Sequence, residues 1–239
     1  MKIEVYSGPD ATAREAARIV ATEARQGVAE RGRFVAAFSG GHTPWLMLRA
    51  LADEDVPWDS VYIVQVDERV APPGDRDRNL THLRESLLDH SPVPPGHVHA
   101  MPVEEPDLIA AAAQYARTLQ SLAGLPPVLD LVHLGLGPDG HTASLVPGDL
   151  AVEVTNADVA MTGPYQGHPR MTLTYPILNR ARRILWMVTG GEKAGMLLRL
   201  CNGDPSIPAG RVRQDAALIL ADKAAAEQFE RKGRLEAKT

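Results

Sequence analysis

The spacing of hydrophobic residues predicts short buried strands that alternate with amphipathic helices. Apolar residues recur every three or four positions at Ala16, Ile19, Val20, Ala24 and Val28, and this spacing is typical of a helix, here over residues 11–31. Short runs that are almost wholly apolar are typical of strands buried on both faces. Such runs lie at residues 33–38, 61–66, 129–134 and 184–188.

The same patterns continue to the end of the chain. They predict further strands at 2–6, 97–101 and 217–220, and strands at 159–162 and 170–173 on either side of a turn at 163–169. They predict further helices at 45–51, 80–88, 107–122, from about 193 to Cys201, and at 223–231. Because strands and helices alternate, we expect a doubly wound α/β fold, Rossmann-like, with a mostly parallel sheet and helices on both faces. No repeat or linker divides the chain, so we expect one domain over residues 1–239.

Composition narrows the class of protein only slightly. The net charge is −5 and no run of Lys or Arg occurs, which argues against nucleic-acid binding. Cys201 is the single cysteine, so a disulfide framework and thiolate metal clusters are excluded. The chain has no signal-peptide pattern and no membrane-length apolar stretch. We expect a cytoplasmic protein, a monomer or a weak homodimer, whose partner is a small molecule.

Four turns that follow predicted strands carry unusual chemistry. In a parallel sheet such turns share the edge where ligands bind, so we expect them to form one crevice. These turns are Ser39–Pro44, Asp67–Arg69, Gly135–His141 and Gly190–Lys193.

The turn at residues 135–141 contains a carboxylate and an imidazole two positions apart. Asp139 and His141 at a crevice suggest an acid/base site; the plain alternative is that Asp139 caps a helix and His141 packs. We expect the residues from Thr142 to Leu145 to begin a helix. The other histidines lack metal-ligand spacing, so we expect no metal site.

The turn at residues 39–44 has the composition of a phosphate cradle. Its N–H groups and the following helix favour an anion, with Pro44 expected at the first helical position; a simple turn with a cap is the alternative. Arg69 and Lys193 are candidate partners for an oxyanion, and Asp67 can hold a sugar hydroxyl or orient a base. The plain alternative for Lys193 is that it is a solvated surface lysine.

Together these motifs resemble the 6-phosphogluconolactonase family, whose fold is related to that of the glucosamine-6-phosphate deaminases. The resemblance spans nearly the whole chain. It rests on S-G-G-x-T-P at Ser39–Pro44, D-E-R at Asp67–Arg69, the Asn79 segment, G-L-G-x-D-G-H-T-A-S-L at Gly135–Leu145, P-R-x-T-L-T at Pro169–Thr174 and G-x-K at Gly191–Lys193. Two departures, His42 and Arg78, bear on how a phosphate is held.

The resemblance implies hydrolysis of 6-phosphoglucono-1,5-lactone without a metal or cofactor. It implies that His141 is the general base. We expect Asp139, Asp67 or Glu68 to orient the imidazole or the water, and nearby N–H groups and Arg69 to stabilise the alkoxide. Residues expected to line the phosphosugar site are Ser39, Gly40, Gly41, His42, Thr43, Asp67, Arg170 and Lys193. A deaminase or isomerase of the same fold, or a phosphosugar-binding protein without catalysis, is the alternative. The deaminases carry D-E-Y in place of Asp67–Arg69, and this difference favours the lactonase.

Overall fold

The computed structural model shows a parallel sheet covered by helices on both faces, and we describe residues 1–230 of the 239-residue chain. Within that range the main sheet has seven strands in the order β1-β10-β9-β6-β2-β3-β5, and every pairing in it is parallel. The strands are β1 (Lys2–Tyr6), β2 (Phe34–Phe38), β3 (Val61–Gln65), β5 (Val98–His99), β6 (Leu131–Leu134), β9 (Arg183–Val188) and β10 (Ala217–Asp222). The predicted doubly wound α/β fold is confirmed.

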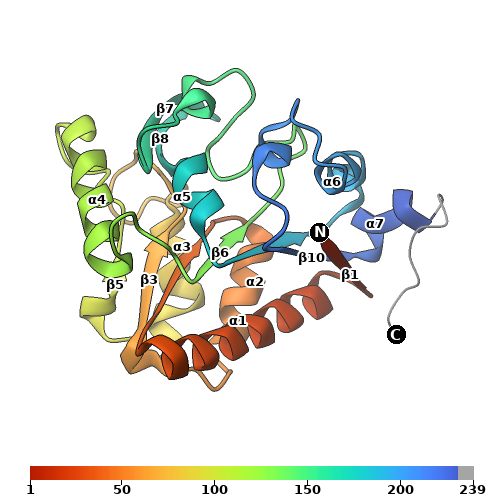
Figure 1. Ribbon diagram of the computed structural model, residues 1–239, viewed down its shortest axis with the longest axis horizontal. Coiled ribbons are helices and arrows are strands. Elements are labelled where there is room, and N and C mark those ends of the chain that lie inside the picture. The colour runs from red at the N-terminus through yellow and green to blue at the C-terminus, as the bar shows by residue number, and fades with distance from the viewer. Residues whose placement is uncertain (231–239) are drawn as a thin grey trace.

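The central strand β2 shows why both faces of the sheet are covered. Phe34, Ala36 and Phe38 face a core formed with α1 (Pro9–Arg31), α2 (His42–Leu51) and α3 (Asn79–Ser86). Val35 and Ala37 face the opposite core, because successive side chains of a strand point to opposite sides. That core includes side chains from α4 (Leu108–Ala123), α5 (Tyr175–Arg180), α6 (Ala194–Cys201) and α7 (Lys223–Glu230). Figure 1 shows α1 along one side of the sheet and α5 on the other.

A small antiparallel sheet lies on the second face. Its order is β4-β8-β7, from β4 (Asp67–Arg69), β8 (His168–Leu173) and β7 (Val159–Tyr165). Figure 1 shows β7 and β8 beside α5, away from α1. Met171 and Leu173 of β8 are fully buried and join the core on this side of the main sheet. The small sheet is thereby fixed to the main sheet by apolar packing.

Several local predictions are wrong in detail. Residues 142–145 form a tight turn with a Thr142–Leu145 bridge rather than a helix, because Ala143 adopts a left-handed backbone with φ 51°. The strands β7 and β8 extend to Tyr165 and from His168, so the turn between them is shorter than expected. The helix α5 was not predicted. The terminal helix α7 is confirmed up to residue 230, and its expected last residue, 231, lies outside the described residues.

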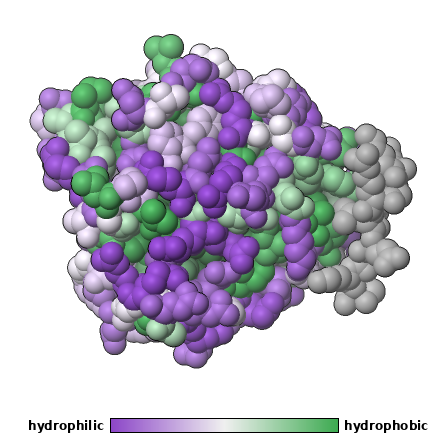
Figure 2. Space-filling model, viewed as in Figure 1, coloured by the Kyte–Doolittle hydropathy of each residue, from purple (hydrophilic) through white to green (hydrophobic). Residues whose placement is uncertain are grey.

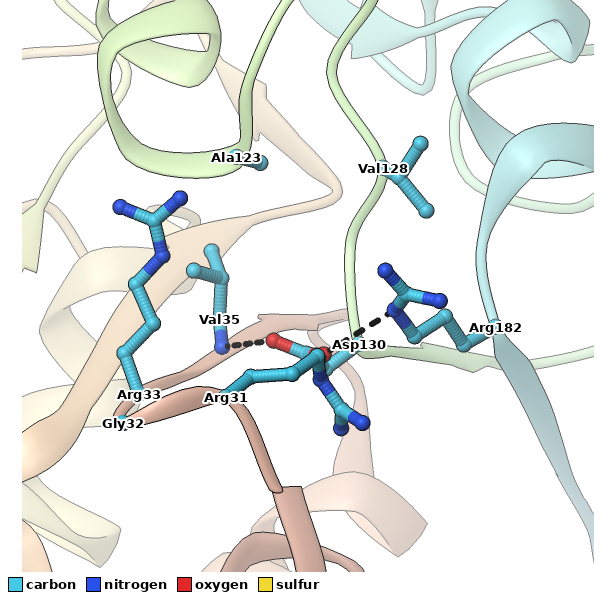
Figure 3. A pocket seen from close by; sticks show the side chains of 8 residues that line it. All are labelled: Arg31, Gly32, Arg33, Val35, Ala123, Val128, Asp130 and Arg182. Atoms are coloured by element: carbon cyan, nitrogen blue, oxygen red, sulfur yellow. Dashed lines mark hydrogen bonds and ion pairs between the residues drawn. The ribbon is translucent and has the colours of Figure 1, made fainter. Parts of the chain in front are cut away.

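The amino ends of the central strands are joined by a buried carboxylate. Asp130 accepts hydrogen bonds from the Val35 N–H at 2.8 Å and from Arg31 Nε at 2.9 Å, and its Oδ1 lies 3.5 Å from Arg182 Nε. Figure 3 shows these groups in a pocket of ≈ 340 Å³ that also contains Arg33. Asp130, which interrupts an apolar run in the sequence, therefore ties β6 to β2 at the end of the sheet opposite the predicted crevice.

The surface is mainly polar. Figure 2 shows hydrophilic residues over most of the visible face, with apolar residues in small separate groups. Among residues 1–230, the large hydrophobic residues that are exposed are Met1, Ile109, Leu125 and Leu150. Within the same range, no helix combines the length and the apolar character that crossing a membrane requires.

Candidate active site

The four turns with unusual chemistry meet in one cleft of ≈ 470 Å³ at the carboxyl ends of the central strands. Its walls come from the turns after β2, β6 and β9 and from the small sheet. Of the residues expected from the sequence, those lining the cleft are Ser39, Gly40, Gly41, His42, Thr43, Asp67, Arg69, His141, Arg170 and Lys193. Asp139 is the remaining one, and it contacts His141 without lining the cleft itself.

His141 and Asp139 form a hydrogen-bonded pair. The Nδ1 atom of His141 lies 2.5 Å from Asp139 Oδ1, and the His141 backbone N–H donates to the same oxygen at 3.1 Å. Because an ionised carboxylate only accepts, the imidazole proton is assigned to Nδ1, which leaves Nε2 with a free lone pair. This is the tautomer that a general base requires.

Close packing in the turn fixes the position of the imidazole. A Cβ atom added to Gly137 would lie 2.1 Å from His141 Nδ1, so no larger residue fits there without moving the ring. The Gly137 N–H also donates to the His141 carbonyl oxygen at 2.9 Å. Gly137 is thus a glycine because the ring packs directly against its backbone.

The charge of Asp139 is stabilised by its neighbours. Partial burial acts to raise the pKa of this carboxyl, but hydrogen bonds from His141 and Tyr165, together with the charge of His141, outweigh it and hold the pKa below its usual value. Asp139 therefore stays ionised near neutral pH and can stabilise a protonated His141.

The turn after β2 brings backbone and hydroxyl groups to the other side of the cleft. The helix α2 begins at His42 and has no side-chain cap. Pro44 is therefore its third residue and not, as predicted, its first, but it still lies in the first turn, where no intrahelical N–H bond is lost. The Thr43 and Thr189 hydroxyls lie 2.7 Å apart and join this turn to the turn after β9. A Cβ at Gly40 would lie 1.8 Å from Asn79 Oδ1, so a bare backbone is needed there.

Asp67, Glu68 and Arg69 form the short strand β4, rather than a loop, because they pair with β8. The alternation of a strand sends their side chains in different directions. Glu68 is fully buried and accepts from the Asn79 and Leu80 N–H groups at 2.7 and 2.8 Å, which caps α3. Asp67 lines the cleft and accepts from the Ser144 hydroxyl at 2.6 Å. Of the three carboxylates considered for orienting His141, Asp139 is the one that contacts it.

Arg69 and Arg170 lie opposite each other in the β4–β8 register. Burial lowers the pKa of Arg170, and the positive charge of Arg69 lowers it further. The Nε atoms of both are buried without a hydrogen-bond partner among the described residues. Two neighbouring guanidinium groups repel each other, and an anion between them would relieve that repulsion.

The remaining predicted residues differ in how firmly they are held. Lys193 lies in the single turn that precedes α6 and has no ion-pair partner within residues 1–230. His42 is exposed at the rim, with its ring centroid 6.2 Å from that of Trp45. Arg78 does not line the cleft: its side chain is buried, with Nη1 2.8 Å from Glu104 and Nε 3.2 Å from Glu68. The departure at position 78 is therefore part of the support for β4 and α3.

Sequence reasoning missed Tyr165, whose hydroxyl donates to Asp139 Oδ2 at 3.2 Å. No local pattern marks this residue, because the contact depends on how the β7–β8 hairpin folds over the turn after β6. Within residues 1–230, no group of three or more His, Cys, Asp or Glu side chains is arranged to hold a metal ion.

The fold and the cleft together define a doubly wound α/β enzyme with its site at the carboxyl ends of the strands. Residues 7–220 match the family described as "Glucosamine-6-phosphate isomerases/6-phosphogluconolactonase", and the chain belongs to that family. It is 35% identical over 206 residues to a 6-phosphogluconolactonase of Nostoc sp., covering 84% of this chain and 85% of the relative. The predicted family and enzyme class, a hydrolase of the 6-phosphogluconolactonase kind, are confirmed.

Solved structures agree with this placement. The 6-phosphogluconolactonase of Thermotoga maritima superposes with a TM-score of 0.82 at 28% identity, covering 92% of this chain and 99% of that one. A monomeric glucosamine-6-phosphate deaminase gives a TM-score of 0.83 at 20% identity, covering 95% of this chain and 99% of that one. The second likeness concerns the fold alone.

Proposed function

We propose that this protein hydrolyses 6-phospho-D-glucono-1,5-lactone to 6-phospho-D-gluconate, the second step of the oxidative pentose phosphate pathway. The names of the relatives support this reaction. The observation that carries the proposal for this chain is the His141–Asp139 pair, with Nδ1 and Oδ1 2.5 Å apart, beside a cleft that also holds Arg69, Arg170 and Lys193.

In the proposed mechanism, neutral His141 acts as the general base. Its free Nε2 takes a proton from water as the water oxygen attacks the lactone carbonyl carbon. Asp139 stabilises the imidazolium that forms, and Arg69 stabilises the negative charge on the carbonyl oxygen. When the tetrahedral intermediate collapses, the bond between the carbonyl carbon and the ring oxygen breaks, and His141 returns its proton to that oxygen.

No covalent nucleophile is required. A lactone is an activated ester, and Ser144, which follows the pair in the sequence, is fully buried with its hydroxyl donated to Asp67. Water attacks directly, and the protein contributes position, a base and charge stabilisation.

The phosphate is assigned to the opposite end of the cleft. The uncapped amino end of α2 and the Thr43 hydroxyl favour an anion, and Lys193 lies in the neighbouring turn. Arg170 and Asp67 are assigned to the sugar between the two ends. We also propose that the protein acts as one domain, as a monomer or weak homodimer in the cytoplasm.

The direct test is hydrolysis of freshly generated 6-phosphogluconolactone, measured against its spontaneous background. The wild type should accelerate the reaction, and His141→Ala should lower kcat by about 10²–10⁴-fold, the usual contribution of a general acid–base group. The matched control is His90→Ala, which removes an exposed histidine outside the cleft.

Each rival predicts a different result. A deaminase would release ammonia from glucosamine 6-phosphate, and a binding protein would take up the phosphosugar without turnover. Near-native kcat in His141→Ala would refute the role of His141, whereas failure of the wild type to hydrolyse the lactone would refute the proposed reaction.

A further inference from the structure

Tyr165 is the side chain that contacts both members of the His141–Asp139 pair. Its hydroxyl donates to Asp139 Oδ2 at 3.2 Å and lies 3.4 Å from His141 Nδ1. The two rings meet edge to face, with centroids 5.2 Å apart and an interplanar angle of 66°. Asp139 thus accepts a hydrogen bond from His141 on Oδ1 and one from Tyr165 on Oδ2.

The hairpin holds Tyr165 firmly in this position. Tyr165 is the last residue of β7, directly before the turn at Gln166. The guanidinium carbon of Arg170 lies 5.0 Å from the Tyr165 ring centroid, and Arg170 Nη2 donates to the Tyr165 carbonyl oxygen at 3.1 Å. Arg170 therefore holds Tyr165 in two ways, by contact with the face of its ring and by a hydrogen bond to its backbone.

We propose that Tyr165 is a positioning residue that, through its hydrogen bond to Asp139, sets the basicity of His141. The inference rests on the proposed function, in which His141 is the general base. Tyr165 does not itself exchange a proton with substrate. It acts by determining how much of the Asp139 negative charge is available to the imidazolium.

The direction of the effect follows from the geometry. A hydroxyl donated to Oδ2 disperses the carboxylate charge and weakens its attraction for a protonated His141. Burial and the charge of Asp139 raise the pKa of Tyr165, so the hydroxyl stays protonated and remains a donor. Removing the hydroxyl concentrates charge on the oxygen that faces His141, and the imidazole then becomes a stronger base.

Other charged groups also face the cleft, and they are the same in wild type and variant. They come from β4, β8, α2 and the turn before α6: Asp67, Arg69, Arg170, His42, Glu192 and Lys193. None of these side chains shares a hydrogen bond or ion pair with His141 or Asp139 in the described chain. A comparison of Tyr165→Phe with wild type therefore isolates the hydroxyl.

The experiment measures the pH dependence of kcat/KM for Tyr165→Phe, which keeps the aromatic ring and its packing. The acid limb, where His141 becomes protonated, should move to higher pH by about 0.5–1 pH unit, less than the 1–3 units by which a nearby opposite charge moves a pKa. The matched control is Tyr6→Phe, because the Tyr6 hydroxyl also donates to a carboxylate, Glu4, at 2.7 Å but outside the cleft.

A second measurement does not depend on turnover. The imidazole resonances of His141, followed by NMR against pH in the free protein, should show the same upward shift in Tyr165→Phe. No shift, or a downward shift, would overturn the role of Tyr165 even in an active enzyme. If the wild type fails to hydrolyse the lactone, the proposed function falls, and the NMR titration still decides whether Tyr165 sets the basicity of His141. A change in thermal stability alone, with both titrations unmoved, would show that Tyr165 only supports the hairpin.

Discussion

The buried histidine of the central sheet predicts a specific loss of stability in acid. His133, on β6, is fully buried, and both of its ring nitrogens lack hydrogen-bond partners among the described residues. Burial lowers the pKa of its imidazole to about 3, because the charged form cannot be solvated there. The folded protein therefore keeps His133 neutral at pH values where the unfolded chain binds a proton.

The sign and size of the effect follow from proton linkage. In the unfolded chain His133 titrates near its reference pKa of about 6.5, so between about pH 6.5 and pH 3 the unfolded state binds more protons and stability falls as the pH falls. At pH 5, protonation of His133 stabilises the unfolded state by RT ln(1 + 10^1.5), which is about 2 kcal/mol relative to pH 8. The folded state gains almost nothing at pH 5, because its pKa lies well below that value. A loss of about 2 kcal/mol is large against a typical total stability of about 5–15 kcal/mol.

The assay is urea unfolding of wild type and His133→Leu at pH 8 and pH 5. Other groups titrate in the same range, so the informative quantity is the difference between the two proteins in their loss of stability. Wild type should lose about 2 kcal/mol more than His133→Leu, which for an m-value of about 3 kcal/mol/M is an extra shift of about 0.7 M in the midpoint. The control His90→Leu, at an exposed histidine, should behave as wild type. Equal losses in wild type and His133→Leu would refute the reasoning.

Two further predictions concern the cleft. Lys193→Ala should raise KM for the phosphorylated lactone by about 10–100-fold, as expected for one charge-assisted contact of about 1.5–3 kcal/mol, with a much smaller fall in kcat. Steady-state kinetics with phosphorylated and unphosphorylated gluconolactone test this. A strong fall in kcat for both substrates would place Lys193 at the carbonyl end. Gly137→Ala should lower kcat by at least about 10²-fold, because the new Cβ displaces the ring of His141, the proposed general base. An unmoved ring in a crystal structure of the variant, together with normal kcat, would contradict this.

The parts of the fold that follow from local pattern were predictable. The apolar run at 61–66 became β3, and the three-to-four spacing of residues 11–31 became α1, because in both cases the pattern reports a face that packs on the core. α5 was missed because Tyr175–Arg180 is too short to establish a helical period, and it is held instead by burial of residues such as Ile177 and Leu178.

The expected helix after His141 failed for a backbone reason. The residues from Thr142 have ordinary helical propensity, but Ala143 takes a left-handed conformation, and Thr142 and Leu145 form a bridge. This geometry lets the Ser144 N–H reach Thr172 Oγ1 at 3.1 Å and the Ser144 hydroxyl reach Asp67. Tertiary hydrogen bonds to the small sheet thus override local preference, and they are not visible in the sequence around the turn.

The site also has parts that local pattern and topology predict and parts that depend on tertiary contacts. The turns after β2, β6 and β9 and the Asp67–Arg69 segment after β3 were predicted to converge because parallel strands present their carboxyl ends at one edge. That rule needs no knowledge of side-chain contacts. The small sheet follows no such rule, since Arg69 and Arg170 are distant in sequence and become neighbours only through the β4–β8 register. The same hairpin brings Tyr165 to Asp139.

This division also indicates how the site is arranged. The main sheet supplies the Gly-rich turn, Thr43, Lys193 and the turn that carries His141 and Asp139, whereas the small sheet supplies Arg69 and Arg170 to the cleft and Tyr165 to Asp139. Under the proposed function, the phosphate therefore rests on the main sheet and the reacting carbonyl lies against the small one. In that arrangement, contacts at the phosphate would be equally strong before and during the reaction and would act on KM, whereas groups around His141 would act on the transition state and on kcat. The β7–β8 hairpin is consequently where changes in sequence would alter the chemistry while leaving the hold on the phosphate intact.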